Sequence, residues 1–480
     1  MARARREVGD IAVSSGNIIA ELNQIPNQPI KFADEDSGRS EDSLIAKTWD
    51  LYIRHREPYS LGAATAPGGA RRGVRRSPLA YSVPFLAAVR SPVRLPMVKA
   101  AVRAMDAIQE FVPTLNITNV PSIERFVLAG GSKRGWCVPR RVKCAIEPGC
   151  LGINRRSPLP SWGAIGRGVG RVTWLAGAVD ARVAGIAPIV IEILDMTPNL
   201  NFEWQVRSVG AACAPSPQRR QPSPASLPRD GSRWQVYGRW PVAFMDYVEM
   251  NVTRCLNCPV FQELGEIEDP KVYLDRFIQR NVPIVSVSAV GDEFFLPDGF
   301  QWWYYDYTGE KYLAIQPNAE HSMFNRIDEL SATLQAFMYT VDKRVARPKF
   351  TWSLSEDGTV LTVQTEETPV AVRLFQAYNE KRGRSFILNC YLSCVWRPTD
   401  VPDSGNNTYV ATVPAPSVGY SGFFIELSFS VGANVPPLTV TTGVSIVPQT
   451  LPYPPCGDVC ARCDTCEPEV RPALAIDPAH

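Results

Sequence analysis

Residues 126–135 read Phe-Val-Leu-Ala-Gly-Gly-Ser-Lys-Arg-Gly, and this stretch decides the fold that the sequence predicts. A short apolar strand ends in a turn of small residues that contains Ser132. A serine that projects from a tight turn between a strand and a helix needs neighbours without bulky side chains, which glycines provide. The pattern therefore predicts a nucleophile elbow at the end of a buried strand.

Two further strand ends carry the partners that a nucleophilic serine requires. Residues 283–290 form an apolar run that stops at Gly291, directly before Asp292. Residues 311–315 form another strand-like run, and the loop after it holds His321, one of only three histidines in the chain. Serine, acid and histidine thus follow one another in the chain order of α/β-hydrolases.

The three residue types have complementary chemical roles. We expect Ser132 to attack as the nucleophile, His321 to accept its proton, and Asp292 to hold the histidine in the correct tautomer. Asp298, at the start of the next predicted helix, is the reserve candidate for the acid. The backbone N–H of Lys133, directly after the serine, is the oxyanion donor that the sequence identifies.

Five short sequence motifs, taken together, identify a protein family more specifically than the elbow alone does. They are Gly131-Ser132-Lys133-Arg134-Gly135-Trp136, Val179-Asp180-Ala181-Arg182-Val183, Ala187-Pro188-Ile189-Val190-Ile191, Asp246-Tyr247-Val248-Glu249-Met250 and Gly291-Asp292-Glu293-Phe294-Phe295. In these motifs the chain resembles the PhoPQ-activated pathogenicity-related protein family. The resemblance implies an α/β-hydrolase-like fold with an appended β-sandwich. It also implies that Arg134, which stands where the usual elbow has its second glycine, is the family's own form of the motif.

The spacing of apolar residues divides the chain into two domains and a tail. Residues 1–345 alternate strand and helix patterns, which predicts a mostly parallel sheet with helices on both faces, in agreement with the α/β-hydrolase-like domain that the resemblance implies. Residues 346–450 alternate apolar and polar side chains between turn signals, which predicts an all-β sandwich of immunoglobulin-like type. Residues 451–480 form a tail rich in cysteine and proline.

Three stretches interrupt the first domain with Arg, Pro, Gly, Ala and Ser that show no apolar periodicity. They lie near residues 58–91, 137–172 and 206–234. If the second stretch is removed, Gly135-Trp136 joins Thr173-Trp174, and the joined sequence has a pattern compatible with a helix. Two interpretations stay open: the stretches are introns translated in a gene model, or they are surface insertions, which loops tolerate. Spliced transcript that contains all three would exclude the first.

Charge and hydropathy exclude several classes of partner. Fifty Lys plus Arg against 48 Asp plus Glu give the 480-residue chain a net charge of only +2, so we expect no nucleic-acid partner. No apolar run is long enough for a membrane span. Gly166-Arg167-Gly168-Val169-Gly170 resembles a phosphate-binding loop, but no strand precedes it. We expect no cofactor and no metal.

Cysteines and glycosylation triplets favour an extracellular location. Eight of the twelve cysteines lie outside the three interrupting stretches, an even number that suits disulfides. The Cys-x-x-Cys spacings could instead indicate a metal site or a redox site. They lack the second cysteine or histidine pair that makes a zinc or thioredoxin-like site a strong prediction. Triplets for N-glycosylation begin at Asn116, Asn251 and Asn406. Because residues 1–7 lack an apolar segment, we expect the signal peptide and the first strands of the fold to be lost by truncation.

Two functions from different classes fit these observations. The first is a secreted serine hydrolase that cleaves a small-molecule ester or a peptide through Ser132, Asp292 and His321. The second is a non-catalytic secreted signal that binds a cell-surface receptor through the same fold. An unusually nucleophilic Ser132 would distinguish the two, because a binding protein has no reason to activate a serine.

Overall fold

The computed structural model describes most of the chain outside the three interrupting stretches. The described residues are 17–22, 25–32, 34–55, 92–115, 122–132, 170–206, 240, 242–380, 384–387 and 394–463. Lys133, Asn116 and the greater part of the interrupting stretches lie outside these ranges. Within them, no helix combines the length and the apolar character that a membrane crossing requires.

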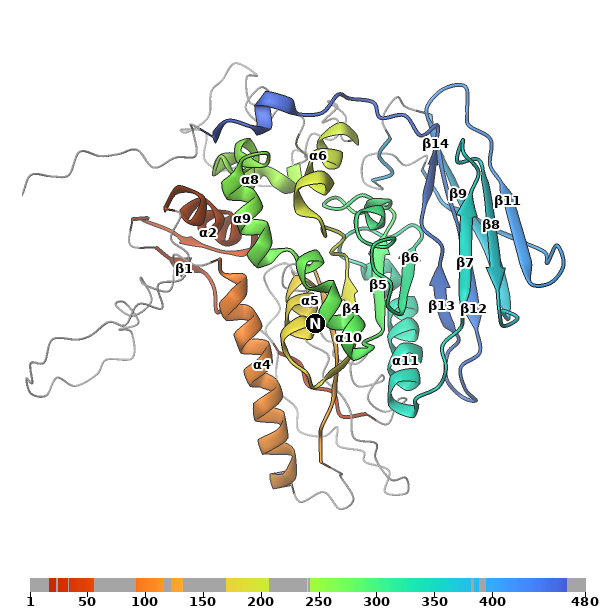
Figure 1. Cartoon of the computed structure of the whole chain (residues 1–480), viewed down its shortest axis with the longest axis horizontal. Helices are drawn as coiled ribbons and strands as arrows, with labels where there is room; N and C mark the ends of the chain where they lie inside the picture. The colour runs from red at the N-terminus through yellow and green to blue at the C-terminus, as the bar shows by residue number, and fades with distance from the viewer. Residues whose placement is uncertain are drawn as a thin grey trace, which may run out of the picture.

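A parallel sheet forms the centre of the molecule (Figure 1). Its strands are β3 (Phe126–Gly131), β4 (Val183–Ile189), β5 (Ile284–Ala289) and β6 (Lys311–Gln316), and each is parallel to its neighbour in that order. Almost all of their residues are buried, because strands covered on both faces bury both sets of side chains. The carboxyl ends of the four strands therefore meet at one edge of the sheet.

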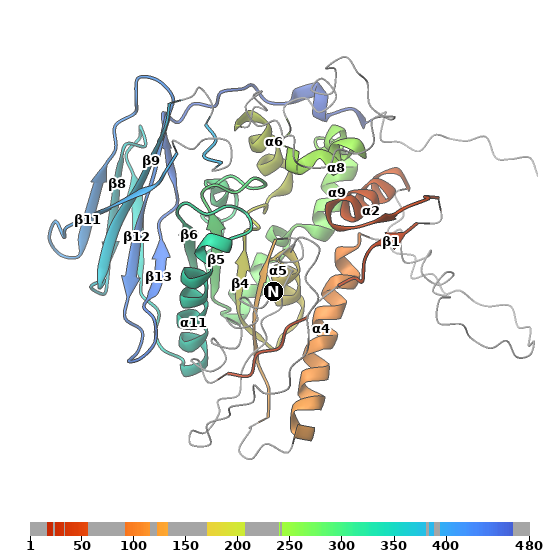
Figure 2. The same cartoon turned by 180° about the vertical axis from the view of Figure 1, so that it is seen from behind.

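Helices cover both faces of this sheet, as the sequence predicts. On one face lie α5 (Gly170–Val179) and α10 (Leu274–Arg280). α5 lies so close to β4 that a Cβ on Gly177 would be 2.7 Å from Ile186 Cγ2. On the other face lies α11 (Ile327–Lys343) (Figures 1 and 2). Its Phe337 side chain packs over Gly185 of β4, where an added Cβ would lie 3.2 Å from Phe337 Cζ. Among the described residues, the other α-helices are α2 (Glu41–His55), α4 (Arg94–Phe111), α6 (Met196–Val206), α8 (Met245–Glu249) and α9 (Pro259–Glu268).

Antiparallel strands from the C-terminal part continue the same sheet. β13 (Leu438–Thr441) pairs with β6, and β12 (Tyr420–Phe429), β9 (Ala371–Asn379) and β10 (Arg397–Asp400) follow in that order, while β14 (Ser445–Val447) also pairs with β12. A second sheet contains β7 (Phe350–Leu354), β8 (Val360–Thr365) and β11 (Thr408–Thr412). The Phe350 ring stacks 6.3 Å from that of Phe429, so the two sheets pack together.

The edge pairing joins the C-terminal strands to the sheet of residues 1–345, and the division of the chain into two domains at this point stays a prediction. Thr441 is the residue that pairs with Leu313 of β6, and its hydroxyl accepts the backbone N–H of Ile315 at 3.2 Å. This contact covers an edge strand that would otherwise present unpaired backbone groups. The immunoglobulin-like type of the C-terminal module stays a prediction.

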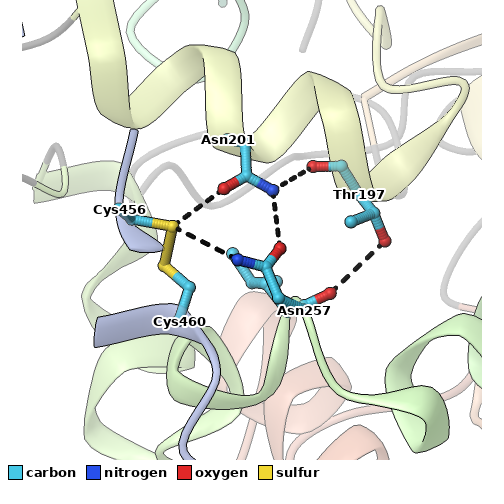
Figure 3. Close-up of a disulfide and its surroundings, with 6 residues drawn as sticks. Thr197, Asn201, Asn257, Cys456 and Cys460 are labelled. Atoms are coloured by element: carbon cyan, nitrogen blue, oxygen red, sulfur yellow. Dashed lines mark hydrogen bonds between the residues drawn. A yellow bond between two sulfur atoms is a disulfide. The ribbon is translucent and has the colours of Figure 1, made fainter. Parts of the chain in front are cut away.

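Disulfides fasten the tail to the helices of the first domain. Cys258–Cys463 joins the start of α9 to the tail, and Cys456–Cys460 closes a short tail loop. Figure 3 shows that loop against Asn201 of α6 and Asn257, whose side chains are joined by a hydrogen bond of 2.9 Å from Asn201 Nδ2 to Asn257 Oδ1. The disulfides expected for these cysteines are therefore present.

Candidate active site

The three predicted catalytic residues lie at the carboxyl ends of neighbouring strands. Ser132 directly follows β3, Asp292 follows β5 and His321 follows β6. The acid loop and the histidine loop are joined by a backbone hydrogen bond of 2.9 Å from Gly291 N–H to the Ala319 carbonyl. Ligand and catalytic groups of parallel α/β sheets gather at this edge, because every strand there ends in a loop on the same side.

Ser132 adopts a backbone conformation that side chains rarely take. Its φ angle is +54°, and its N–H donates to the carbonyl of Ile189 at 2.7 Å. A non-glycine residue in this left-handed region costs roughly 1–3 kcal/mol, and such strain is found where a side chain must be aimed. This sharp turn after a strand is the geometry of a nucleophile elbow.

The side chains of the three residues form a continuous hydrogen-bonded chain. His321 Nε2 lies 2.7 Å from Ser132 Oγ. His321 Nδ1 lies 2.9 Å from each carboxylate oxygen of Asp292. With the ring proton on Nδ1, the imidazole donates to Asp292 and accepts the hydroxyl proton of Ser132. The arrangement can therefore move a proton from the serine to the histidine.

Asp292 is held rigidly and is almost inaccessible to water. It is 2% exposed, and its Oδ1 accepts the backbone N–H groups of Phe294 at 2.7 Å and Phe295 at 3.1 Å. The Phe294 ring lies 4.4 Å from the imidazole of His321. The carboxylate thus stays fixed beside the histidine in an environment of low polarity, which strengthens the interaction between the two groups.

Glu293 has a role that the sequence did not assign. Its Oε2 accepts the backbone N–H of His321 at 3.0 Å, so it fixes the histidine loop from the backbone side. Burial raises the pKa of this carboxyl group above its ordinary value. Only its place beside Asp292 in the sequence could have drawn attention to it.

Asp298, the reserve acid, lies against the C-terminal part of the chain. Its Oδ2 lies 2.6 Å from Nη1 of Arg384, and both residues are buried. The carboxylate beside the imidazole is that of Asp292. Lys133, the expected oxyanion donor, lies outside the described residues.

A cavity, partly open to solvent, adjoins Ser132. Most of the side chains around it are apolar: Trp49, Ile191, Ile193, Leu200, Phe244, Val252, Leu256, Phe294 and Phe295. Three charged residues, Asp42, Arg94 and Arg171, also line it. Sequence reasoning did not group these residues as a cavity lining, because they come from segments far apart in the chain.

Among the described residues, no group of three or more His, Cys, Asp or Glu side chains is arranged to hold a metal ion.

Comparison with known proteins supplies the family. The model of the PhoPQ-activated pathogenicity-related protein family matches residues 2–66, 84–139, 163–215 and 230–386. The unmatched segments between them, 67–83, 140–162 and 216–229, each lie within one of the three interrupting stretches. Whether those stretches are translated introns or insertions stays a prediction.

One relative and one solved structure complete the comparison. The crystal structure of proline iminopeptidase from Mycobacterium smegmatis aligns with a TM-score of 0.21 and 14% identity, over 38% of this chain and 66% of that one. The chain is 31% identical over 469 residues to Autocrine proliferation repressor protein A of Dictyostelium discoideum, and the alignment covers 93% of this chain and 74% of that protein. The chain belongs to the PhoPQ-activated pathogenicity-related protein family.

Proposed function

We propose that the protein is a secreted serine hydrolase of the α/β-hydrolase type, which cleaves an ester or peptide bond of a small substrate. The observation that carries this proposal is the 2.7 Å contact between Ser132 Oγ and His321 Nε2, with Asp292 on the other ring nitrogen. A hydroxyl, an imidazole and a carboxylate in this order activate a serine that is otherwise a poor nucleophile.

The reaction follows from the positions of these atoms. Ser132 Oγ forms a bond to the carbonyl carbon of the substrate while its proton passes to His321 Nε2, and Asp292 stabilises the imidazolium that results. The N–H of Lys133 is the proposed donor to the oxyanion. The imidazolium then protonates the leaving group, and the bond between that group and the carbonyl carbon breaks. Water, deprotonated by the same nitrogen, releases the acyl group and restores Ser132.

The strained backbone of Ser132 supports the same proposal. A φ of +54° costs stability, and nothing in a purely structural turn requires a serine there when glycine would avoid the strain. A side chain that must reach His321 explains why the position carries a hydroxyl.

A second function is favoured by the name of one relative. Because the chain is similar to an autocrine proliferation repressor, we also propose a non-catalytic secreted signal as the alternative. In that case a surface of the first domain, or an immunoglobulin-like C-terminal sandwich, would bind a cell-surface receptor. Ser132 would then have ordinary reactivity.

Reaction with a fluorophosphonate probe separates the two functions. We expect the wild-type protein to be labelled, and the Ser132→Ala and His321→Ala variants to remain unlabelled. Ser322→Ala is the matched control, because this neighbouring serine donates its hydroxyl proton to Glu320 at 2.6 Å. Absence of labelling in a wild-type protein with a cooperative unfolding transition would refute the hydrolase and favour the signal.

A further inference from the structure

The loop that carries His321, residues 317–323, is held from two sides. On one side lies the acid loop, where Gly291 donates its N–H to the carbonyl of Ala319 at 2.9 Å and Glu293 Oε2 accepts the N–H of His321 at 3.0 Å. On the other side lies the C-terminal part of the chain, where the side chain of Asn318 contacts Trp396. Both sides therefore bear on the position of the imidazole.

Asn318 makes a two-way hydrogen bond with the backbone of Trp396. Its Oδ1 accepts the N–H of Trp396, and its Nδ2 donates to the carbonyl of the same residue, each at 2.8 Å. The amides of Asn and Gln are the side chains that carry a donor and an acceptor side by side in one planar group. Asn318 thus pairs with Trp396 as a residue of a neighbouring strand would, although the two residues are 78 positions apart.

Trp396 provides a rigid support for this contact. It is 1% exposed, and its ring lies 5.3 Å from that of Phe386 and 5.5 Å from that of Phe424 in β12. An added Cβ on Gly422, also in β12, would lie 2.8 Å from the same ring, so the indole fills the space over this strand. Because close-packed aromatic side chains resist displacement, the backbone of Trp396 stays in place.

The backbone of Asn318 allows the role of its side chain to be tested by itself. Its φ angle is +55°, and its carbonyl accepts Nδ2 of Asn325 at 2.6 Å. Asparagine tolerates this left-handed conformation better than most residues, but glycine adopts it without strain. A glycine at this position would therefore keep the turn and lose only the link to Trp396, three residues before His321.

The proposed chemistry depends on the exact place of this loop. His321 lies 2.7 Å from Ser132 Oγ and 2.9 Å from the carboxylate of Asp292 at the same time. A displacement of about 1 Å in such a site lowers the rate roughly 100-fold. The bonds to Asp292 and Glu293 tie the histidine to the acid loop, whereas the bond through Asn318 ties it to the C-terminal strands.

We propose that Asn318 is a positioning residue of the hydrolase site. Its amide fixes the histidine loop to the backbone of Trp396 and thereby holds the imidazole between Ser132 and Asp292. This inference rests on the proposed hydrolase function, and it makes the C-terminal strands a part of the machinery of that site. Asn318 acts through the loop and exchanges no proton with the reacting groups.

The Asn318→Gly variant tests the proposal, because it removes both hydrogen bonds to Trp396 and preserves the positive φ. We expect the second-order rate constant of fluorophosphonate labelling, expressed per folded molecule, to fall about 10- to 100-fold. Asn281→Gly is the matched control. Asn281 has a φ angle of +52° and is exposed at the end of α10, before β5, so it lies away from the edge of the sheet that holds the site. We expect its variant to react at the wild-type rate.

Proton NMR separates a positioning role from a loss of stability. The Nδ1–H of an imidazole that donates to a carboxylate resonates far downfield, and the chain has only three histidines, so the His321→Ala variant identifies the signal. We expect the resonance in the wild-type protein and in Asn281→Gly. It should be weakened or absent in Asn318→Gly under conditions in which urea denaturation shows this variant to be folded.

A second variant applies if Asn318→Gly does not fold. Asn318→Asp keeps an acceptor for the N–H of Trp396 and loses the donor to its carbonyl, so we expect labelling to be several-fold slower than in the wild-type protein. An unchanged labelling rate in folded Asn318→Asp would refute the proposal.

The outcomes separate this inference from the hydrolase proposal. If Ser132 is labelled equally fast in the wild-type protein and in Asn318→Gly, the hydrolase stands and the positioning role is refuted. Equal slowing in Asn281→Gly refutes it as well. If Ser132 is unreactive in the folded wild-type protein, the hydrolase fails, and the NMR signal decides about Asn318: its loss in Asn318→Gly alone supports the positioning of His321. The same resonance in both proteins, or none in the wild-type protein, would overturn the inference.

Discussion

The Asp292→Asn substitution should disable the proposed site without altering its shape. Two backbone N–H groups, from Phe294 and Phe295, donate to Oδ1 of Asp292. They would hold the asparagine oxygen in that position and leave its NH2 group in place of Oδ2, which lies 2.9 Å from Nδ1 of His321. An N–H donor there favours the tautomer with the proton on Nε2, and this nitrogen can then no longer accept the proton of Ser132.

The expected loss is large. A wrong tautomer in a Ser-His-Asp site lowers the rate roughly 10³–10⁴-fold, which corresponds to about 4–5.5 kcal/mol of transition-state stabilisation. The second-order rate constant of fluorophosphonate labelling measures this loss directly, and chemical denaturation shows whether the variant is folded.

Asp298→Asn is the matched comparison, because it makes the same chemical change at the reserve acid. It removes the partner of the buried Arg384, so we expect a loss of about 3–5 kcal/mol in unfolding free energy. The labelling rate of its folded fraction should equal that of the wild-type protein. A slower labelling rate in Asp298→Asn than in Asp292→Asn would refute the assignment of the acid.

Three further predictions concern stability. Burial raises the pKa of Glu192 above its ordinary 4.5, so the folded protein binds this proton more tightly than the unfolded chain does. The free energy of unfolding therefore falls as the pH rises through the raised pKa. The Glu192→Gln variant should lack that fall in urea titrations at several pH values. Cys258→Ser opens the Cys258–Cys463 disulfide, which spans 205 residues, and should cost up to about 5 kcal/mol in guanidinium denaturation. Gly177→Ala places a methyl group against Ile186 and should cost about 1–3 kcal/mol, measured the same way.

Each of these three has a clear contrary result. An unchanged pH dependence in Glu192→Gln would mean that this carboxyl group is not the one that titrates. Equal stability of Cys258→Ser and the wild-type protein under oxidising conditions would contradict the tail disulfide. A neutral Gly177→Ala would mean that α5 lies farther from β4 than the structure has it.

The strands that carry the candidate site, and the place of each candidate residue at a strand end, could be predicted from the sequence. Apolar runs that end in small or polar residues predict β3, β5 and β6 with boundaries within about two residues, because a buried parallel strand shows no polar alternation. Ser132, Asp292 and His321 follow those runs, so the topology of a parallel sheet is sufficient to bring them to one edge. The sequence also predicts a helix at residues 327–339, which is present and extends to Lys343.

Contacts between distant segments could not be predicted. Arg94 and Glu268 are 174 positions apart, and neither has a local pattern that indicates its partner. The pairing of β13 with β6 rests on one residue pair, Thr441 and Leu313, which no periodicity reveals. The sequence also predicts a strand at residues 17–22, but the structure has none there, because apolar content alone does not provide a neighbouring strand with which to pair.

The central claim is that Ser132 is an activated nucleophile. Its most direct test is mass spectrometry of the intact protein after reaction with a fluorophosphonate, followed by peptide mapping. We predict one adduct per chain, on Ser132, that fails to form in His321→Ala. A folded protein that gains no adduct, or that gains one on another residue with Ser132 unmodified, would contradict the account.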